Sequence, residues 1–402
     1  MSNKEDSIRE CSFCGKTKEA SKKLIVGENA GICDECVRFC GELLGQDMTE
    51  FEPKSPIDLD PIGIKKHLDE HVIGQEKAKI MLAVAVANHY KRIGKKTAIE
   101  LDKANVLFLG PTGCGKTMLA RAIAKYLDVP FAIADATSLT EAGYVGDDAE
   151  TMIARLLHAS GGDVKQAERG IIFIDELDKI ARKSESTSIT RDVSGEGVQQ
   201  ALLKIVEGTK CRVNLTGNRK HPSGAVEEVD TTNILFIAGG AFVGLEQVIK
   251  NRIKGGGMGF GSTISKDSES TFENVIPDDL LKYGLIPELV GRFTDVVHLD
   301  ELDEQQLCSI MTDVKNNLVD QYKYLFSLDQ ILLDVRADAI RAIAKRTQTL
   351  KTGARGLHTE FERALLPHMY NVRRYRDQGI KTVIIDEKQI ENPTVLVDVK
   401  TT

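Results

Sequence analysis

The sequence predicts an α/β fold: a parallel-sheet domain, with a small, mainly helical domain after it and a small zinc-binding domain before it. Short apolar runs alternate with helical stretches through the middle of the chain, and this alternation favours a parallel sheet covered on both faces. A glycine-rich loop follows the first of these runs, and paired cysteines lie near the N-terminus.

The domain boundaries are expected where the composition changes. Pro53, Pro56 and Pro61 lie among scattered acidic residues and indicate a linker. After His298, amphipathic helical patterns replace the strand patterns. We therefore expect a zinc-binding domain over 1–48, a linker over 49–62, a large domain over 63–298 and a small C-terminal domain over 299–402.

Composition narrows the class of protein. The chain has 402 residues, more than one ordinary domain, and its 42% hydrophobic and 28% charged residues are typical of globular proteins. A net charge of −7 gives no basic face, so we expect no nucleic-acid partner. No apolar run approaches the roughly 18 residues of a membrane span, and the segment MSNKEDSIRE lacks the apolar core of a secretory signal. We expect a cytoplasmic protein with no membrane contact.

The N-terminal cysteines have the spacing of a zinc site. Cys11, Cys14, Cys33 and Cys36 form two C-x-x-C pairs with 18 residues between them. Four thiolates close a tetrahedral centre, so we expect one structural Zn²⁺ per chain. A redox pair or incidental cysteines are the alternative. Cys40 lies four residues after Cys36 and could replace a ligand, although a buried thiol is the simpler interpretation.

Apolar periodicity places the main elements. The expected strands of the sheet cover 105–109, 171–174 and 233–238. A helical pattern starts at Lys65, and 77–92 has a broad apolar face at helical spacing. In the C-terminal domain we expect helices within 303–326 and over 337–348, and a late strand over 381–386.

A phosphate-binding loop is the clearest motif. The segment GPTGCGKT matches G-x-x-x-x-G-K-[ST], directly after an expected strand and before an expected helix. Its glycines let backbone N–H groups point at phosphate oxygens. Lys116 is expected to reach the β- and γ-phosphates of ATP, and Thr117 to bind Mg²⁺. The expected nucleotide-binding residues here are Gly110, Pro111, Thr112, Gly113, Cys114, Gly115, Lys116, Thr117 and Met118.

Two acidic residues follow the second expected strand. Asp175 at the strand tip can hold the shell of a Mg²⁺ ion, and Glu176 can orient and deprotonate an attacking water. Solvated carboxylates at a strand exit are the alternative, but the phosphate-binding loop favours the catalytic interpretation. The sequence therefore predicts hydrolysis of a nucleoside triphosphate.

A second motif, His67-Leu-Asp-Glu70-His71, fits the H-x-x-E-H pattern of some zinc peptidases. The helical pattern breaks at Gly74, and no further ligand is evident nearby. We interpret this segment as a solvated helix end.

These motifs together resemble the AAA+ ATPases, and most closely the ClpX family, the ATPase partners of the ClpP peptidase. The resemblance covers essentially the whole chain. Besides the phosphate-binding loop, Asp175-Glu176 and the cysteines, it rests on 143–146 (GYVG), 219–221 (RKH), 291–293 (GRF) and 353–356 (GARG).

The resemblance implies roles at the nucleotide. Arg292 resembles the arginine finger that one subunit supplies to its neighbour's ATP, and Arg355 resembles the sensor-2 arginine. Val72 and Ile73 resemble the segment that lines the adenine pocket. The implied catalytic residues are Lys116, Asp175, Glu176, Arg292 and Arg355.

The resemblance also implies contacts with proteins. Tyr144 and Val145 resemble the pore loop that grips polypeptide, and Arg219, Lys220 and His221 resemble a basic loop at the pore entrance. Met258-Gly259-Phe260 resembles the tripeptide that docks on the peptidase ring, with methionine where an Ile, Leu or Val is usual. Methionine is adaptable and of similar volume, so docking is expected to survive this departure.

The implied activity is ATP-driven unfolding and translocation of tagged proteins through the pore of a homohexamer. The unfolded chains pass to a separate ClpP-type peptidase, because this sequence has no convincing peptidase apparatus of its own. Adaptor proteins, a dimerising zinc domain and chaperone remodelling without the peptidase are implied too. An AAA+ nucleic-acid remodelling ATPase and a scaffold that uses nucleotide only to assemble are the alternatives.

Overall fold

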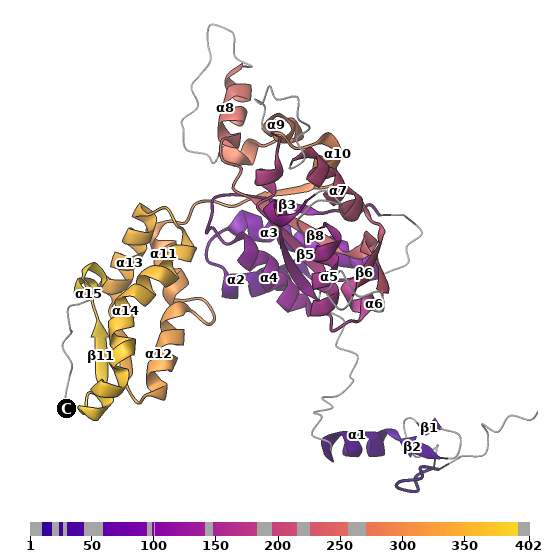
Figure 1. The fold of residues 1–402 in the computed structure, drawn as a ribbon, viewed down its shortest axis with the longest axis horizontal. Helices are drawn as coiled ribbons and strands as arrows, with labels where there is room; N and C mark the ends of the chain where they lie inside the picture. The colour runs from indigo at the N-terminus through magenta and orange to yellow at the C-terminus, as the bar shows by residue number, and fades with distance from the viewer. Residues whose placement is uncertain are drawn as a thin grey trace, which may run out of the picture. The chain divides into compact units, whose positions relative to one another are not determined.

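The computed structural model describes residues 10–17, 24–26, 30–43, 59–94, 99, 101–140, 148–182, 195–214, 226–255 and 271–392. The chain forms two compact units, Met1–Asp58 and Leu59–Thr402 (Figure 1). No helix among the described residues is both long and apolar enough to cross a membrane.

The first unit is small. Strands β1 (Leu24–Val26) and β2 (Gly31–Cys33) pair antiparallel, and helix α1 (Asp34–Leu43) follows directly. Asp34 and Glu35 lie in the first turn of α1, where the negative charge of a carboxylate interacts favourably with the helix dipole.

A parallel sheet of five strands forms the centre of the second unit, in the order β4-β5-β8-β3-β9. The strands are β3 (Val106–Leu109), β4 (Phe131–Asp135), β5 (Ile171–Asp175), β8 (Leu235–Gly240) and β9 (Asp295–His298). Each neighbouring pair runs parallel. The prediction of a parallel sheet is therefore confirmed.

Helices cover both faces of the sheet. Successive side chains of a strand point to opposite faces, so each strand contributes to the apolar cluster on either side. Val106 and Phe108 of β3 pack with α2 (Pro61–His71), α3 (Glu76–Gly94) and α4 (Lys116–Leu127). Leu107 and Leu109 belong to a second apolar cluster, on the other face. That cluster takes side chains from α5 (Glu150–Ala159), α6 (Val164–Ala167), α7 (Glu196–Glu207), α8 (Leu245–Gly255), α9 (Pro277–Tyr283) and α10 (Pro287–Val290), and from the hairpin of β6 (Lys210–Asn214) and β7 (Val226–Asp230).

Helix α2 begins at Pro61, four residues before the expected start at Lys65. Proline is favoured at the first helical position, where its missing N–H is not needed. The proline that indicates a linker in the sequence therefore starts a helix.

A third apolar cluster holds the C-terminal helices together, drawn in orange to yellow in Figure 1. Its elements are α11 (Glu304–Thr312), α12 (Leu318–Leu328), α13 (Ala337–Thr349), α14 (Ala354–Asp377), α15 (Glu387–Glu391) and the parallel pair β10 (Leu332–Val335) and β11 (Thr382–Ile385). The expected segment 303–326 forms two helices, because Asn316 has positive φ and Asn317 caps the second helix. The predicted helical character of this part of the chain is confirmed.

Three expected protein-contact segments lie outside the described residues. They are Tyr144 and Val145, the basic segment 219–221, and the tripeptide 258–260.

Candidate functional site

The phosphate-binding loop connects β3 to α4 in a conformation that needs its glycines. Gly110, Gly113 and Gly115 all have positive φ, at 156°, 79° and 105°. A Cβ at Gly110 would lie 2.5 Å from the carbonyl oxygen of Leu299, so a side chain there would displace the backbone. The loop therefore leaves its backbone groups free of side-chain cover, as a phosphate cradle requires.

Lys116 is only 8% exposed, and its ammonium group lies inside the loop. Its Nζ donates to the carbonyl oxygens of Gly110 at 2.6 Å and Pro111 at 2.8 Å. These bonds hold the positive charge at the N-terminus of α4, where the helix dipole also favours an anion.

Asp175 and Glu176 come from the carboxyl end of β5, which β8 separates from β3 in the sheet. The hydroxyl of Thr117 donates to Oδ2 of Asp175 at 3.5 Å. A hydroxyl and a carboxylate are oxygen ligands that suit Mg²⁺. Glu176 has a φ of 58° and an exposed side chain. This left-handed turn, rare for glutamate, takes the chain out of the strand immediately after Asp175.

These side chains share one cleft of about 440 Å³. Lys116, Thr117, Asp175, Glu176 and Arg355 all line it. Arg355 reaches the cleft from the first turn of α14, so one site combines groups that are 239 positions apart (355 − 116). Thr112, Gly113, Gly115 and Met118 line the same cleft.

The loop tip is in direct backbone contact with the start of α14. The N–H of Ala354 donates to the carbonyl oxygen of Gly113 at 3.0 Å. A Cβ at Gly353 would lie 2.8 Å from the carbonyl oxygen of Thr112 and 2.9 Å from Cα of Gly113. The two glycines therefore let the start of α14 come closer to the loop tip than side chains would permit. This close approach positions Arg355.

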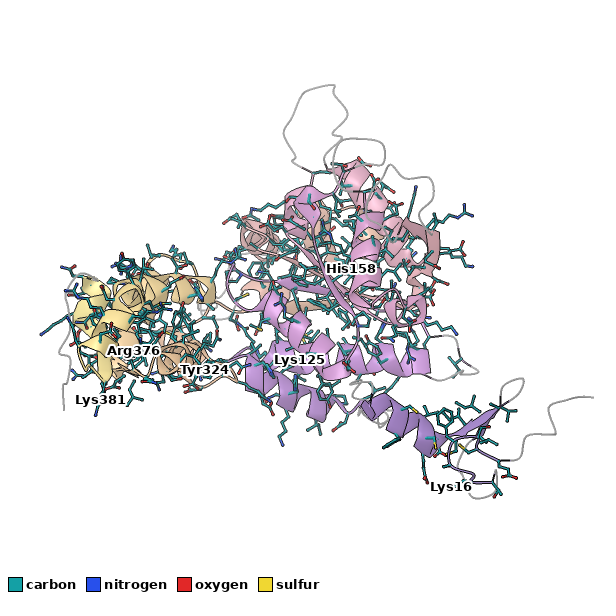
Figure 2. The ribbon with its side chains drawn as sticks, turned by 60° about the horizontal axis from the view of Figure 1, so that its bottom comes forward. Lys16, Lys125, His158, Tyr324, Arg376 and Lys381 are labelled. Atoms are coloured by element: carbon teal, nitrogen blue, oxygen red, sulfur yellow. The ribbon has the colours of Figure 1, made fainter. Side chains whose placement is uncertain are left out.

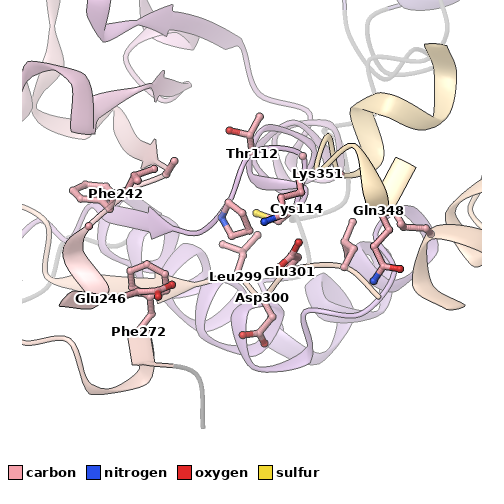
Figure 3. A pocket seen from close by; sticks show the side chains of 18 residues that line it. Thr112, Cys114, Phe242, Glu246, Phe272, Leu299, Asp300, Glu301, Gln348 and Lys351 are labelled. Carbon is pink, nitrogen blue, oxygen red and sulfur yellow. The ribbon is translucent and has the colours of Figure 1, made fainter. Parts of the chain in front are cut away.

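A second cavity of about 800 Å³ lies on another side of the loop tip (Figure 3). Thr112 and Cys114 line it together with Phe242, Leu299 and Lys351. Cys114 is buried, and this burial raises the pKa of its thiol, so the group is an uncharged part of the wall. Pro111 and Gly113 contribute as well.

Val72 and Ile73 follow α2 and lie behind the loop. Val72 is buried, and its Cγ1 lies 3.7 Å from the position that a Cβ at Gly115 would take. Among the described residues that line the two cavities, neither Val72 nor Ile73 is included. The structure thus brings Val72 to the loop without placing it in either wall.

Gln75 connects the segment after α2 to the phosphate-binding loop through hydrogen bonds, a role that motif analysis does not identify. Its Nε2 donates to the carbonyl oxygens of Asp300 at 2.8 Å and Cys114 at 3.4 Å. Its Oε1 accepts from the N–H of Asp300 at 3.0 Å. In the sequence, Gln75 ends the segment Val72-Ile73-Gly74-Gln75, which resembles the one that lines the adenine pocket.

Motif analysis also missed part of the cleft wall. Arg121, Asp178 and Lys179 line it beside the expected residues. Asp178 is buried and accepts from the N–H of Ala241 at 3.2 Å, which fixes the end of β8 against the turn after β5. No pattern in the sequence distinguishes these residues from ordinary surface charges.

Arg292 does not line the cleft of its own chain within the described residues. Its guanidinium pairs with Glu207 at the end of α7, through Nη2 at 2.7 Å and Nε at 3.0 Å. Its backbone carbonyl accepts from the buried side chain of Asn105 at 2.9 Å. The arginine is therefore held on the outside of the sheet domain, about half exposed.

The four N-terminal cysteines come together in the first unit. Ligand atoms of Cys11, Cys14, Cys33 and Cys36 lie within 4.8 Å of one another, and Cys40 is not part of this group. The N–H of Cys33 donates to Sγ of Cys11 at 3.2 Å. Burial would raise the pKa of Cys11, but N–H groups, that of Cys33 foremost, lower it to about 6, whereas the hydrogen bond with Cys14 raises the pKa of Cys36.

The short elements around the cysteines hold this geometry. Gly15 has a φ of 75°, and its N–H donates to the carbonyl oxygen of Cys11 at 2.8 Å, closing the turn between the first two cysteines. Lys16, labelled in Figure 2, pairs with Glu35 of α1 and joins this turn to the helix. The donor set of four thiolates fits zinc.

A phosphate-binding loop on a parallel sheet, with a strand-tip Asp-Glu pair and a helical C-terminal part, defines an AAA-type ATPase that also carries a zinc finger. Residues 101–296 match the family described as AAA domain (Cdc48 subfamily), and residues 9–46 match the ClpX C4-type zinc finger.

Comparison with whole proteins gives the family. The chain is 48% identical over 395 residues to the ATP-dependent Clp protease ATP-binding subunit ClpX of Treponema denticola, covering 95% of this chain and 94% of the relative. Subunits of the same name from Borrelia duttonii and Borrelia recurrentis are 48% identical over 402 residues, covering 98% of this chain and 93% of each relative. The chain belongs to the ClpX family.

The contact between the loop tip and α14 predicts different effects for two glycine substitutions. Gly353→Ala should weaken ATP binding at least about tenfold, roughly 1.4 kcal/mol, because its Cβ would collide with the loop. Gly379→Ala is the matched control, since Gly379 also has positive φ but has open space around it. Titration with a fluorescent ATP analogue measures both; equal affinities in the two variants would contradict the role of this contact.

The cysteine geometry predicts the zinc content of two further variants. Cys14→Ser should lose the metal and unfold the first unit, whose few strands and single helix cannot supply a core alone. Cys40→Ser should keep the metal, because Cys40 lies outside the ligand group. Elemental analysis of the purified chains decides this, and zinc loss in the Cys40 variant would place that thiol in the site.

Proposed function

We propose that this chain is a subunit of a ring-shaped ATPase that unfolds tagged proteins and delivers them to a separate ClpP-type peptidase. The proposal is carried by one observation: Lys116, Asp175, Glu176 and Arg355 line a single cleft. In this proposal, a large domain over 63–298 provides most of the residues that line the cleft, and a small domain over 299–402 provides Arg355.

Each residue of the cleft has a role that follows from its charge and position. The backbone of the loop and Lys116 bind the β- and γ-phosphates. Thr117 and Asp175 hold Mg²⁺, which neutralises phosphate charge when bound. Glu176, exposed at the cleft, accepts a proton from the attacking water. Arg355 approaches the phosphates from the first turn of α14.

The position of Arg292 supports a ring. A guanidinium can stabilise the charge that develops on a transferred phosphoryl group, yet Arg292 is not among the described residues that line its own cleft, and it pairs with Glu207. In the proposed homohexamer it serves the ATP of the neighbouring subunit. Val72 and Ile73 contact the adenine in this proposal.

Substrate contacts belong to the segments outside the described residues. Tyr144 and Val145 grip the polypeptide in the pore, and Arg219, Lys220 and His221 attract acidic or carboxylate-ended tags at its entrance. Met258, Gly259 and Phe260 dock on the peptidase. A substrate domain is stable by about 5–15 kcal/mol, so repeated pulls driven by hydrolysis are needed to unfold it.

The remaining proposals concern the role of the first unit, further partner proteins and the location of the protein in the cell. One zinc ion per chain stabilises the domain over 1–48. Exposed apolar side chains there, Phe13, Ile25 and Phe39 among them, support a dimerising role. Adaptor proteins as partners, remodelling without the peptidase and a cytoplasmic location complete the proposal.

Replacement of the proposed base separates binding from hydrolysis. Glu176→Gln should bind ATP with unchanged affinity, while the rate of ATP hydrolysis falls by about 10²–10⁴, since the amide cannot accept the proton. Unfolding of a tagged stable protein, followed by loss of its fluorescence, should stop as well. Glu387→Gln, an exposed acid on α15, is the control and should behave as wild type.

The same assay tests the class of substrate. ATP hydrolysis by the wild-type chain should rise with unfolded protein and not with DNA. Stimulation by DNA alone, or unfolding that continues unchanged in the Glu176 variant, would contradict the proposed function.

A further inference from the structure

The last turn of α2 brings together three side chains that the nucleotide site does not use. His67, Glu70 and His71 are spaced i, i+3 and i+4, so they share one face of the helix. One ligand atom from each lies within 4.8 Å of the others. The imidazole rings are 4.4 Å apart between centroids.

A hydrogen bond selects the free nitrogen of His71. Its Nδ1 lies 3.0 Å from the carbonyl oxygen of His67. A carbonyl oxygen only accepts, so Nδ1 carries the hydrogen and Nε2 of the neutral ring carries the lone pair. Metal-binding histidines usually have this arrangement, with the other ring N–H donated to a carbonyl or carboxylate.

His67, a member of this cluster, has an unsatisfied ring nitrogen. Its Nε2 is shielded from solvent and has no hydrogen-bond partner among the residues that the structure describes. The ring lies against His71 and, at 5.0 Å between centroids, against Tyr126 of α4. A buried polar atom normally has a partner, so this nitrogen is available to a ligand.

A metal ion can compete with Lys315 for the carboxylate of Glu70. The carboxylate is 46% exposed and lies 3.7 Å from Nζ of Lys315, which is 63% exposed. An exposed ion pair of this kind is weak. Lys125 of α4, labelled in Figure 2, is the other lysine whose charge acts on His67, and it is exposed and screened by solvent.

We propose that His67, Glu70 and His71 form a second metal site, for a divalent transition ion of the Zn²⁺ class. Two imidazoles and one carboxylate are a donor set that zinc accepts, with a remaining position for water. Bonds of about 2.0–2.2 Å require the ligand atoms to move closer together, and rotation of the exposed Glu70 side chain supplies much of that movement. This site belongs to the second compact unit, and the four cysteines belong to the first.

Its place in the fold links the metal to other parts of the chain. Glu70 leaves Lys315, in the connection between α11 and α12, when it turns to the ion. Val72, which contacts the phosphate-binding loop, is the next residue after His71. The inference itself does not depend on the proposed function.

Equilibrium dialysis of the full-length chain tests the site. Chains with a zinc-loaded cysteine centre are dialysed against graded Zn²⁺ in the presence of excess Mg²⁺, and bound metal is measured by mass spectrometry. Wild type should take up a second equivalent. His71→Gln should weaken that second binding step at least about tenfold. His358→Gln is the control, since His358 also has a glutamate at i+4 but belongs to no ligand cluster among the described residues.

Two further measurements make the outcome decisive. Co²⁺ added to the same chains should give visible absorption without the sulfur charge-transfer band of a thiolate site. Glu70→Gln, at an exposed position, should weaken the second step too, and it decides the question if the His71 variant fails to fold. The proposal is overturned if wild type holds only one equivalent, or if the second equivalent persists in folded His71→Gln or in Glu70→Gln.

Discussion

The backbone contact between Gly113 and Gly353 is the constraint on which the nucleotide site depends. The phosphate-binding loop is held on one side by β3 and α4, and on the other by the N–H of Ala354. Because both glycines have positive φ and no Cβ, the start of α14 can approach the loop to van der Waals distance. Arg355, one residue further on, reaches the cleft as a consequence. Any movement of α14 relative to the sheet therefore acts first on the loop that holds the phosphates.

Charge is arranged around this contact in two ways. Lys116 is buried and fixed by two carbonyl oxygens, so it is already oriented before an anion arrives, and little further ordering is needed at the moment of reaction. Arg292 is held outside the cleft by Glu207. An exposed pair of this kind is worth at most about 1 kcal/mol, so a neighbouring nucleotide could displace Glu207 at little cost.

The sequence predicts those parts of the structure that depend on local chemistry. The loop from Gly110 to Thr117 needs glycine, lysine and threonine at fixed spacing, and the cysteine pairs need theirs, so both motifs are visible without a fold. The three central strands of the sheet are continuous apolar runs and were predicted. The two strands of this sheet that the sequence analysis does not predict, β4 and β9, are its edges. Edge strands are partly exposed, and Asp135 at the end of β4 and Asp295 at the start of β9 shorten the apolar runs.

Features made by distant segments could not be predicted in this way. Gln75 binds the backbone of Asp300, 225 positions away, and no local pattern encodes that contact. The unsatisfied nitrogen of His67 depends on the packing of α2 against α4, so the motif H-x-x-E-H alone indicated a solvated helix end. The expected pore and docking residues lie outside the described residues, and their roles stay predictions.

We propose that an arginine from another copy of the chain completes the hydrolytic site. Mixing two inactive variants tests it most directly. A Lys116→Ala chain keeps Arg292 but cannot hydrolyse its own nucleotide, and an Arg292→Ala chain keeps an intact cleft. Each variant should be inactive alone, and ATP hydrolysis should return in mixed rings. Normal hydrolysis by Arg292→Ala alone, or mixed rings that stay inactive, would contradict it.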